Sequence, residues 1–234
     1  GRFPGAKKAL LAGMARDQIA RNQRQKLLGG QLEQVRHSPD SLRLNLLRGM
    51  PQGELVQLLT HWLDDLNLPQ PSGRMLLELA GNIVNQNKID MAASELEFRD
   101  WVNVVYVLRP LPAIDFVGCS LGDFEFPGGC LSNDFVKGGG LRASAVYRVA
   151  FRSGKEKILM GKNRDIKNIF QESRVPSWLR DRIPLIYAGN ELVAIAAVPD
   201  WQISMKVADG WLARTGEEGF EVSLSLADRV LTEG

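Results

Sequence analysis

Six basic residues in a segment of 21 positions are the side chains best suited to a chemical task. Arginine presents a planar fork that can bind one phosphate through two hydrogen bonds, and lysine presents a point charge. A row of such groups on a rigid element can follow a nucleic-acid backbone. We therefore predict a polyanion-binding surface formed by Lys162, Arg164, Lys167, Arg174, Arg180 and Arg182. The structural alternative is that Arg180 or Arg182 forms an ion pair with Asp181 or Glu172.

The distribution of charge along the chain supports this interpretation. The net charge is only +2, yet residues 152–182 carry nine Lys or Arg against four Asp or Glu. Residues 1–48 carry ten against three, and the remainder of the chain is acidic. Such asymmetry is typical of one surface that faces a polyanion. Arg16, Arg21 and Arg24 are the second group of candidate contacts, and basic residues that merely solvate helix faces are the alternative for both groups.

Groups suited to catalysis are scarce. The two histidines, His37 and His61, are expected in a loop and at the edge of a helix, and the sequence contains neither HExxH nor GxSxG. The glycines at 138–140 lack the spacing of a phosphate-binding loop and predict a flexible turn. Asp64 and Asp65 point in different directions on a helix, so they do not form a metal site. We predict no catalytic residue, metal ligand or cofactor within this chain.

The first 108 residues are expected to form a helical domain closed by a β-hairpin. Helices are predicted at 7–35, 51–67 and from Ser72 onward, where Ser72 suits the N-cap position. In the first helix an apolar stripe is expected at Leu10, Leu11, Met14, Ile19, Leu27, Leu28, Leu32 and Val35, with a break at Gly29-Gly30. Short strands are predicted at 42–46, 95–99 and 102–108.

The second domain is expected at 113–234, after a Pro- and Gly-rich linker at 109–122. Strands are predicted at 123–126, 144–151, 156–160, 184–188, 191–198 and 219–226, with Gly189-Asn190 as a hairpin turn. One helix is predicted at 163–173, with Ile166, Ile169 and Phe170 facing inward and Lys162 and Arg164 at its entrance. The fold class is therefore α+β, with a basic helix packed on short strands.

The motifs of this second domain resemble a known family. The order "IFQE", "VPSWLRDRIPLIY" and "GNELVAIAAV" is similar to the C-terminal domain of tRNA(Ile)-lysidine synthetases. Upstream, "LLTHWLDDLNLPQPSGRMLLELAGNIV" and "ELEFRDWVNVVYVL" resemble the helical middle domain of that family. Two features depart from the family pattern: Asp165 and Asn168 replace lysines of the basic helix, and no SGGxDS phosphate loop is present.

The resemblance implies a role in RNA modification. Such enzymes use ATP, with Mg²⁺, to adenylate the wobble cytidine of an isoleucine tRNA, and L-lysine then displaces AMP. The resemblance implies that this chain is the tRNA-binding half, that tRNA(Ile) is its partner, and that catalysis belongs to an N-terminal domain outside it. It also implies a cytoplasmic protein, in keeping with the absence of a signal-peptide pattern and of a long apolar run.

Two other functions remain open at this point. The first is a protein-interaction or dimerisation module that binds no RNA and pairs its basic surface with an acidic partner. A homodimer is compatible with either that module or the tRNA-binding half. The second is a free-standing enzyme with an unrecognised site. The small number of His and Cys residues argues against it.

Overall fold

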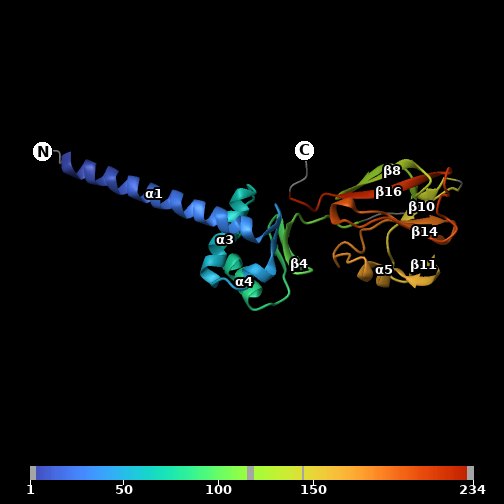
Figure 1. The fold of residues 1–234 in the computed structure, drawn as a ribbon, viewed down its shortest axis with the longest axis horizontal. Coiled ribbons are helices and arrows are strands. Elements are labelled where there is room, and N and C mark those ends of the chain that lie inside the picture. The colour runs from blue at the N-terminus through green and yellow to red at the C-terminus, as the bar shows by residue number, and fades with distance from the viewer. Residues whose placement is uncertain (1–3, 115–118, 144, 231–234) are drawn as a thin grey trace. The chain divides into compact units, whose positions relative to one another are not determined.

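The computed structural model describes residues 4–114, 119–143 and 145–230. The chain forms two compact units (Figure 1). Unit 1 runs up to Pro110 and also includes Arg229 and Val230, whereas unit 2 runs from Leu111 to Asp228. The described residues combine helices with several small sheets, as expected for an α+β protein.

Four helices form in unit 1: α1 (Pro4–Val35), α2 (Leu44–Leu47), α3 (Gln52–Asp65) and α4 (Gly73–Val84). In α3 and α4 apolar residues recur at helical spacing, so each helix buries one face in the core of the unit. Ser72 caps α4 as predicted, because its hydroxyl accepts a hydrogen bond from the backbone N–H of Met75 at 3.3 Å.

Helix α1 differs from the sequence-based expectation in two ways. It continues through Gly29-Gly30, so the predicted break is wrong. Glycine inside a helix costs only about 1 kcal/mol, and the packing of α1 on α3 outweighs that cost. The apolar stripe is buried only near the C-terminal end of α1, at Leu32 and Val35. Met14, Ile19 and Leu27 are exposed, and the side chains of Leu10 and Leu11 lie outside the described part.

The sheet of unit 1 is antiparallel and has the strand order β1-β2-β5-β4-β3. Its strands are β1 (Arg36–Ser38), β2 (Ser41–Arg43), β3 (Asp90–Ala93), β4 (Leu96–Trp101) and β5 (Val104–Leu108). The predicted hairpin is confirmed, and Val102 and Asn103 at its turn both have positive φ. The strand predicted at 42–46 stops at Arg43, because Leu44 and Leu47 bury one face of α2 instead.

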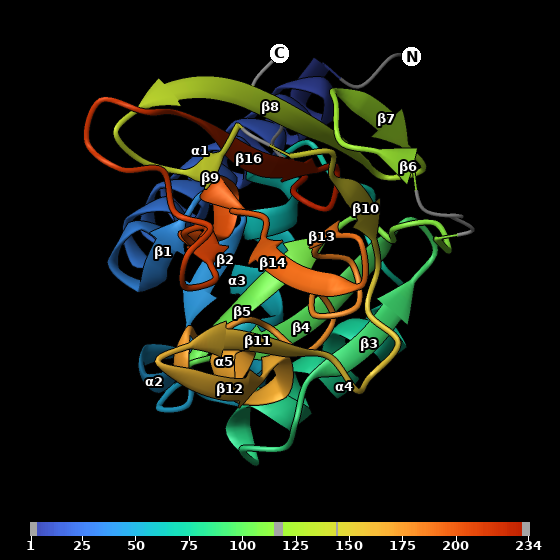
Figure 2. The ribbon, with the colours of Figure 1, turned by 90° about the vertical axis from the view of Figure 1, so that its right-hand side faces the viewer.

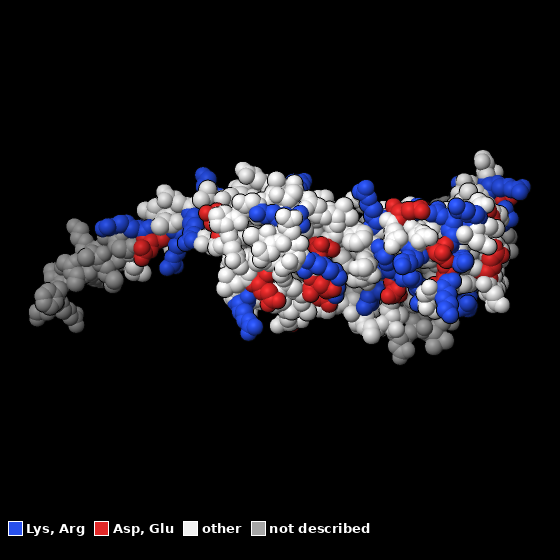
Figure 3. All heavy atoms as spheres, turned by 90° about the horizontal axis from the view of Figure 1, so that it is seen from below, with Lys and Arg blue, Asp and Glu red and all other residues white. Residues whose placement is uncertain are grey.

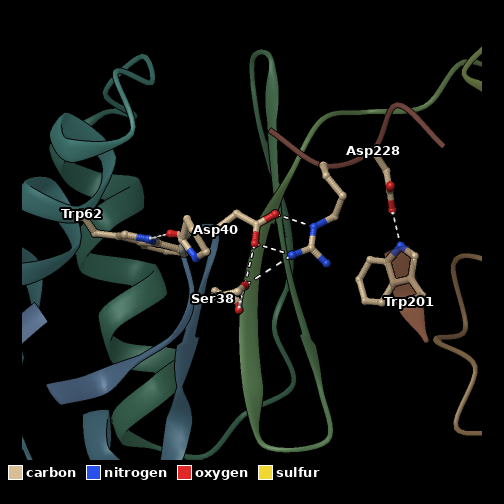
Figure 4. A network of polar contacts seen from close by, with 8 residues as sticks. Ser38, Asp40, Trp62, Trp201 and Asp228 are labelled. Carbon is tan, nitrogen blue, oxygen red and sulfur yellow. Dashed lines mark hydrogen bonds and ion pairs between the residues drawn. The ribbon is translucent and has the colours of Figure 1, made fainter. Parts of the chain in front are cut away.

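A buried ion pair ties Arg229 into unit 1 (Figure 4). Its guanidinium binds the carboxylate of Asp40 and donates to the hydroxyl of Ser38 at 3.3 Å. The Asp40 side chain is 3% exposed and that of Arg229 is 18% exposed. The guanidinium also lies over the ring of Tyr106, 5.6 Å from its centroid. Because a buried charge needs a partner, Arg229 and Asp40 depend on each other.

Unit 2 stacks three small β layers (Figures 1 and 2). The upper sheet has the order β7-β8-β16-β9, formed by Phe124–Phe126, Gly129–Lys137, Glu218–Leu226 and Leu141–Arg142. The middle sheet has the order β15-β14-β13-β10-β6, formed by Lys206–Val207, Glu191–Ile195, Leu185–Ala188, Arg148–Ala150 and Cys119–Ser120. The lower layer is the hairpin of β11 (Lys157–Met160) and β12 (Lys162–Asp165) with helix α5 (Ile166–Glu172). A 3-10 helix, η1, spans Pro199–Trp201.

Glycine residues shape two turns of unit 2. Gly189-Asn190 connects β13 to β14 as predicted, and Ala188 pairs with Glu191 on either side of it. Gly138 and Gly140 have φ of 73° and 72°. A Cβ atom on Gly140 would lie 2.3 Å from the carbonyl oxygen of Phe220, so only glycine fits there. The glycine run is therefore a tight turn after β8, a strand that the sequence analysis did not predict.

The Asp40–Arg229 pair gives a direct stability prediction. We expect Arg229→Met to lower the free energy of unfolding by about 3 kcal/mol, because Asp40 would remain as a buried, unpaired charge. Urea unfolding followed by circular dichroism measures this change. Adding Asp40→Asn to Arg229→Met is expected to recover part of the loss.

Lys88→Met is the matched control for this experiment. Lys88 lies 3.6 Å from Asp90, and both side chains are largely exposed. Removing such a surface pair is expected to change the free energy of unfolding by less than about 1 kcal/mol. Equal unfolding midpoints for Arg229→Met and Lys88→Met would contradict the assigned role of the buried pair.

Candidate nucleic-acid interface

The β11–β12 hairpin sets the direction of the first two candidate cations. Ile158 on β11 is buried and pairs with Arg164 on β12, and Met160 pairs with Lys162. Residues that face each other across an antiparallel pair point to the same side of the sheet. Arg164 therefore points toward the core side, where its guanidinium pairs with Glu172 of α5. The side chain of Lys162 lies exposed at the end of the hairpin.

The helix predicted at 163–173 is shorter than expected. It begins at Ile166 and ends at Glu172, so Lys162 and Arg164 lie on strand β12 and not at a helix entrance. Gly161, with a φ of 70°, reverses the chain and allows β12 to return along β11. The predicted inward face of the helix is confirmed, because Ile166, Ile169 and Phe170 are buried.

Lys167 is the exposed cation of α5. It borders a hollow of about 300 Å³ between residues 152–156 and the start of the helix. Burial alone would raise the pKa of Glu156, but hydrogen bonds from Ser153 and Gly154 outweigh burial and hold that pKa below its ordinary value. The hollow thus contains an ionised carboxylate, which would repel an anion inside it, whereas Lys167 lies exposed at its border.

Arg174 occupies the position after α5 where helices commonly carry glycine. The N–H of Val175 bonds the carbonyl of Phe170 at 2.8 Å, and the N–H of Arg174 bonds that of Gln171 at 3.1 Å. These two bonds define a Schellman motif, which requires a left-handed residue, and Arg174 has a φ of 53°. A non-glycine residue in this conformation costs of order 1 kcal/mol. Arg174 is exposed at this position, where a glycine would avoid the backbone strain.

Arg180 and Arg182 serve the architecture of unit 2. Arg182 donates to the carbonyl oxygens of Leu111 and Pro112 at 3.0 and 2.7 Å. Arg180 donates to the carbonyl oxygen of Val175 at 3.1 Å. These bonds use part of each fixed guanidinium fork, which leaves fewer N–H groups for phosphate.

The N-terminal candidates lie on α1. Arg16 and Arg21 are exposed. Arg24 is exposed and donates to the side-chain oxygen of Gln57 on α3 at 2.6 Å. The structure therefore places these three cations on unit 1 and the other six on unit 2.

Further cations share the lower layer of unit 2. Figure 3 views the face that carries α5 and β11, and it shows Lys and Arg gathered over unit 2 with acidic side chains between them. Lys155 and Lys157 are exposed, and Lys157 lies 3.9 Å from Asp165. Arg152 pairs with Asp181 at 3.1 Å. These cations belong to the basic segment 152–182 but were not among the predicted contact residues. The pattern "KEKILM", in which cations precede a short apolar run, was the available signal for an exposed strand end.

Among the described residues, no group of three or more His, Cys, Asp or Glu side chains could hold a metal ion. Within the same part of the chain, no helix combines the length and the apolar character that crossing a membrane requires.

Comparison with known proteins agrees with the motif assignment. The family described as TilS substrate C-terminal domain matches residues 147–224, which contain β11, β12 and α5. The tRNA(Ile)-lysidine synthase of Legionella pneumophila (strain Paris) is 23% identical over 189 residues, covering 75% of this chain and 44% of that protein. The synthase of Shigella flexneri is 26% identical over 184 residues, covering 74% and 43%.

A solved structure described as "Crystal structure of TILS C-terminal domain" is 20% identical, with a TM-score of 0.31. It covers 47% of this chain and 98% of its own. The chain spans less than half the length of the two synthases compared above. Residues 147–224 thus match the TilS substrate C-terminal domain, and about three quarters of the chain resembles the C-terminal part of tRNA(Ile)-lysidine synthases.

Proposed function

We propose that this chain is the tRNA-binding portion of a tRNA(Ile)-lysidine synthase, an ATP-dependent ligase. The observation that carries the proposal is that exposed cations on a rigid layer, Lys162, Lys167 and Arg174, fall inside the segment that matches the family. A double-stranded RNA stem is recognised mainly by its shape and phosphates, so positioned cations are sufficient for binding.

The chemistry is assigned to another part of the whole enzyme. The relatives are more than twice as long as the segment they share with this chain. ATP, Mg²⁺ and L-lysine are accordingly assigned to that other part, which would convert the wobble cytidine to lysidine. We propose that unit 1 contains the middle domain predicted at residues 1–108 and that unit 2 contains the C-terminal domain predicted at 113–234, which the division of the chain into two compact units supports.

The contact residues can be ordered by the exposure of their side chains. Lys162, Lys167 and Arg174 come first, since their side chains are exposed. Arg164, Arg180 and Arg182 come second, because they are half-buried and bind Glu172 or backbone carbonyls. We assign the first three to phosphates of the acceptor region, and Arg16, Arg21 and Arg24 to a separate part of the tRNA.

Lys162→Ala/Lys167→Ala tests the first group. Each lost phosphate contact is expected to weaken tRNA binding by on the order of 1 kcal/mol and to reduce the salt slope by about one unit. Filter binding at several salt concentrations measures both quantities. Lys88→Ala/Lys206→Ala removes the same charge elsewhere and is expected to change neither quantity as much. Equal affinities and slopes for the two double variants would remove β12 and α5 from the interface.

Arg174→Gly separates binding from folding. Glycine suits the left-handed position after α5, so the variant is expected to unfold at the same urea concentration as the wild type or at a higher one. Binding of tRNA is nevertheless expected to weaken by about 1 kcal/mol, with a shallower salt dependence. Unchanged tRNA binding by this folded variant would show that Arg174 does not contact RNA.

The competing function is a protein-interaction module whose basic surface binds an acidic protein. It predicts that the chain binds tRNA no better than any other polyanion of equal charge. Competition with heparin and with an unrelated tRNA distinguishes the two functions, since a tRNA(Ile) binder retains its complex at heparin concentrations that displace the unrelated RNA.

A further inference from the structure

The turn that carries Lys162 consists of a single residue. Met160 on β11 pairs with Lys162 on β12, so Gly161 alone lies between the two strands. The commonest hairpin loops have two residues, which form a hydrogen-bonded turn of their own. Gly161 is exposed and has a φ of 70°. Because one residue cannot form the two-residue turn, the end of this hairpin depends on contacts from another segment.

Asp209, which follows β15, supplies such contacts. Its carboxylate accepts a hydrogen bond from the N–H of Gly161. Its own N–H donates to the carbonyl oxygen of Leu159 at 2.8 Å. Hydrogen bonds to charged acceptors are roughly twice as strong as those between neutral groups. Asp209 thus binds the hairpin on strand β11 and again at the turn, one residue before Lys162.

The residues beside Asp209 hold it in place. The N–H of Ala208 donates to the carbonyl oxygen of Val193 on β14 at 2.8 Å, and Ala208 is 1% exposed. The N–H of Trp211 donates to the carbonyl oxygen of Ala208 at 3.1 Å, which closes a turn around Asp209 and Gly210. Gly210 has a φ of 80°, which suits the third position of a type II turn. The contact with the hairpin therefore comes from a loop that is fixed to the middle sheet.

The charge of Asp209 opposes RNA binding at this place. Asp209 is exposed, and its carboxylate binds the residue that precedes Lys162. A carboxylate close to a bound phosphate repels it. The charge of Asp209 and its hydrogen bond to Gly161 are therefore expected to have opposite effects on RNA binding, so an experiment can separate them.

We propose that Asp209 is a positioning residue of the RNA-binding surface, which fixes the backbone at Lys162 so that the ammonium group stays within reach of one phosphate. The inference rests on the proposed function, because it assumes that Lys162 contacts tRNA. The lysine side chain is a flexible four-carbon stem, so the position of its backbone determines the region that the charge can reach. A backbone that is fixed before binding lowers the ordering cost of association.

Asp209→Ala and Asp209→Asn are the matched variants that test this role. Both remove the same charge, but only the asparagine side chain can still accept a hydrogen bond from the N–H of Gly161. In filter binding, Asp209→Ala is expected to bind tRNA(Ile) about threefold more weakly than Asp209→Asn. In the Lys162→Ala background the two variants are expected to bind equally. Equal affinities when Lys162 is present, or a difference that persists in the Lys162→Ala background, would overturn the proposal.

Asp200→Ala and Asp200→Asn form the control pair. Asp200 is exposed on η1, in the same unit but outside the β11–β12 hairpin, so these two variants are expected to bind tRNA equally. A difference between them as large as that at Asp209 would count against a specific role of Asp209. A general loss of stability would weaken binding with and without Lys162, whereas positioning acts only through Lys162. Urea unfolding of the Asp209 variants measures that stability.

Amide hydrogen exchange without RNA distinguishes this inference from the proposed function. Asp209→Ala is expected to lose the protection of the Gly161 N–H, whereas Asp209→Asn and the wild type retain it. Equal exchange of this N–H in all three proteins would overturn the positioning role, whether or not tRNA binds. A wild-type chain that shows the protection but binds no tRNA would instead overturn the proposed function, and with it the assumption that Lys162 contacts RNA.

Discussion

The burial of Ile158, Ile166 and Phe170 is the constraint on which the lower layer of unit 2 depends. Each of these side chains is about 1% exposed, so the hairpin and the helix cannot rotate without exposing apolar surface. The alternation along β12 then directs Arg164 to the core side, whereas Lys162 is exposed because it lies at the end of the hairpin. Apolar packing of the hairpin and the helix therefore positions the cations of this layer.

The second determinant is competition for the guanidinium groups. An arginine has five donors in a rigid fork, and carbonyls or carboxylates within unit 2 already use several of them. By contrast, the side chains of Lys162 and Lys167 are exposed. Arg174 is exposed, at a position where glycine would relieve strain. The proposed RNA contacts consequently rest on two lysines and one arginine.

Local signals predicted part of this fold. The cap at Ser72, the turn at Gly189-Asn190 and the inward face of α5 follow from short sequence patterns, and all three are present. Strand β12 was taken for the start of the helix because "KNRD" has no strand character of its own, and its conformation depends on pairing with β11. Strand β8 was missed because its apolar alternation is incomplete.

Long-range contacts lay beyond any local pattern. Arg229 and Asp40 are 189 positions apart, and no spacing rule connects them. The same holds for Arg182, which binds carbonyls 71 and 70 positions away. The charge of the sequence located the candidate surface. The structure was needed to tell which of its arginines bind groups within unit 2 and which are exposed.

Lysine labelling with an amine-reactive reagent, read by mass spectrometry with and without tRNA(Ile), tests the central claim most directly. The account predicts that saturating tRNA protects Lys162 and Lys167 strongly. Lys88, which lies in unit 1 outside the proposed contacts and is 74% exposed, is expected to react equally in both states. Equal labelling of Lys162 and Lys167 in the presence and absence of bound tRNA would contradict the claim that the lower layer of unit 2 binds RNA.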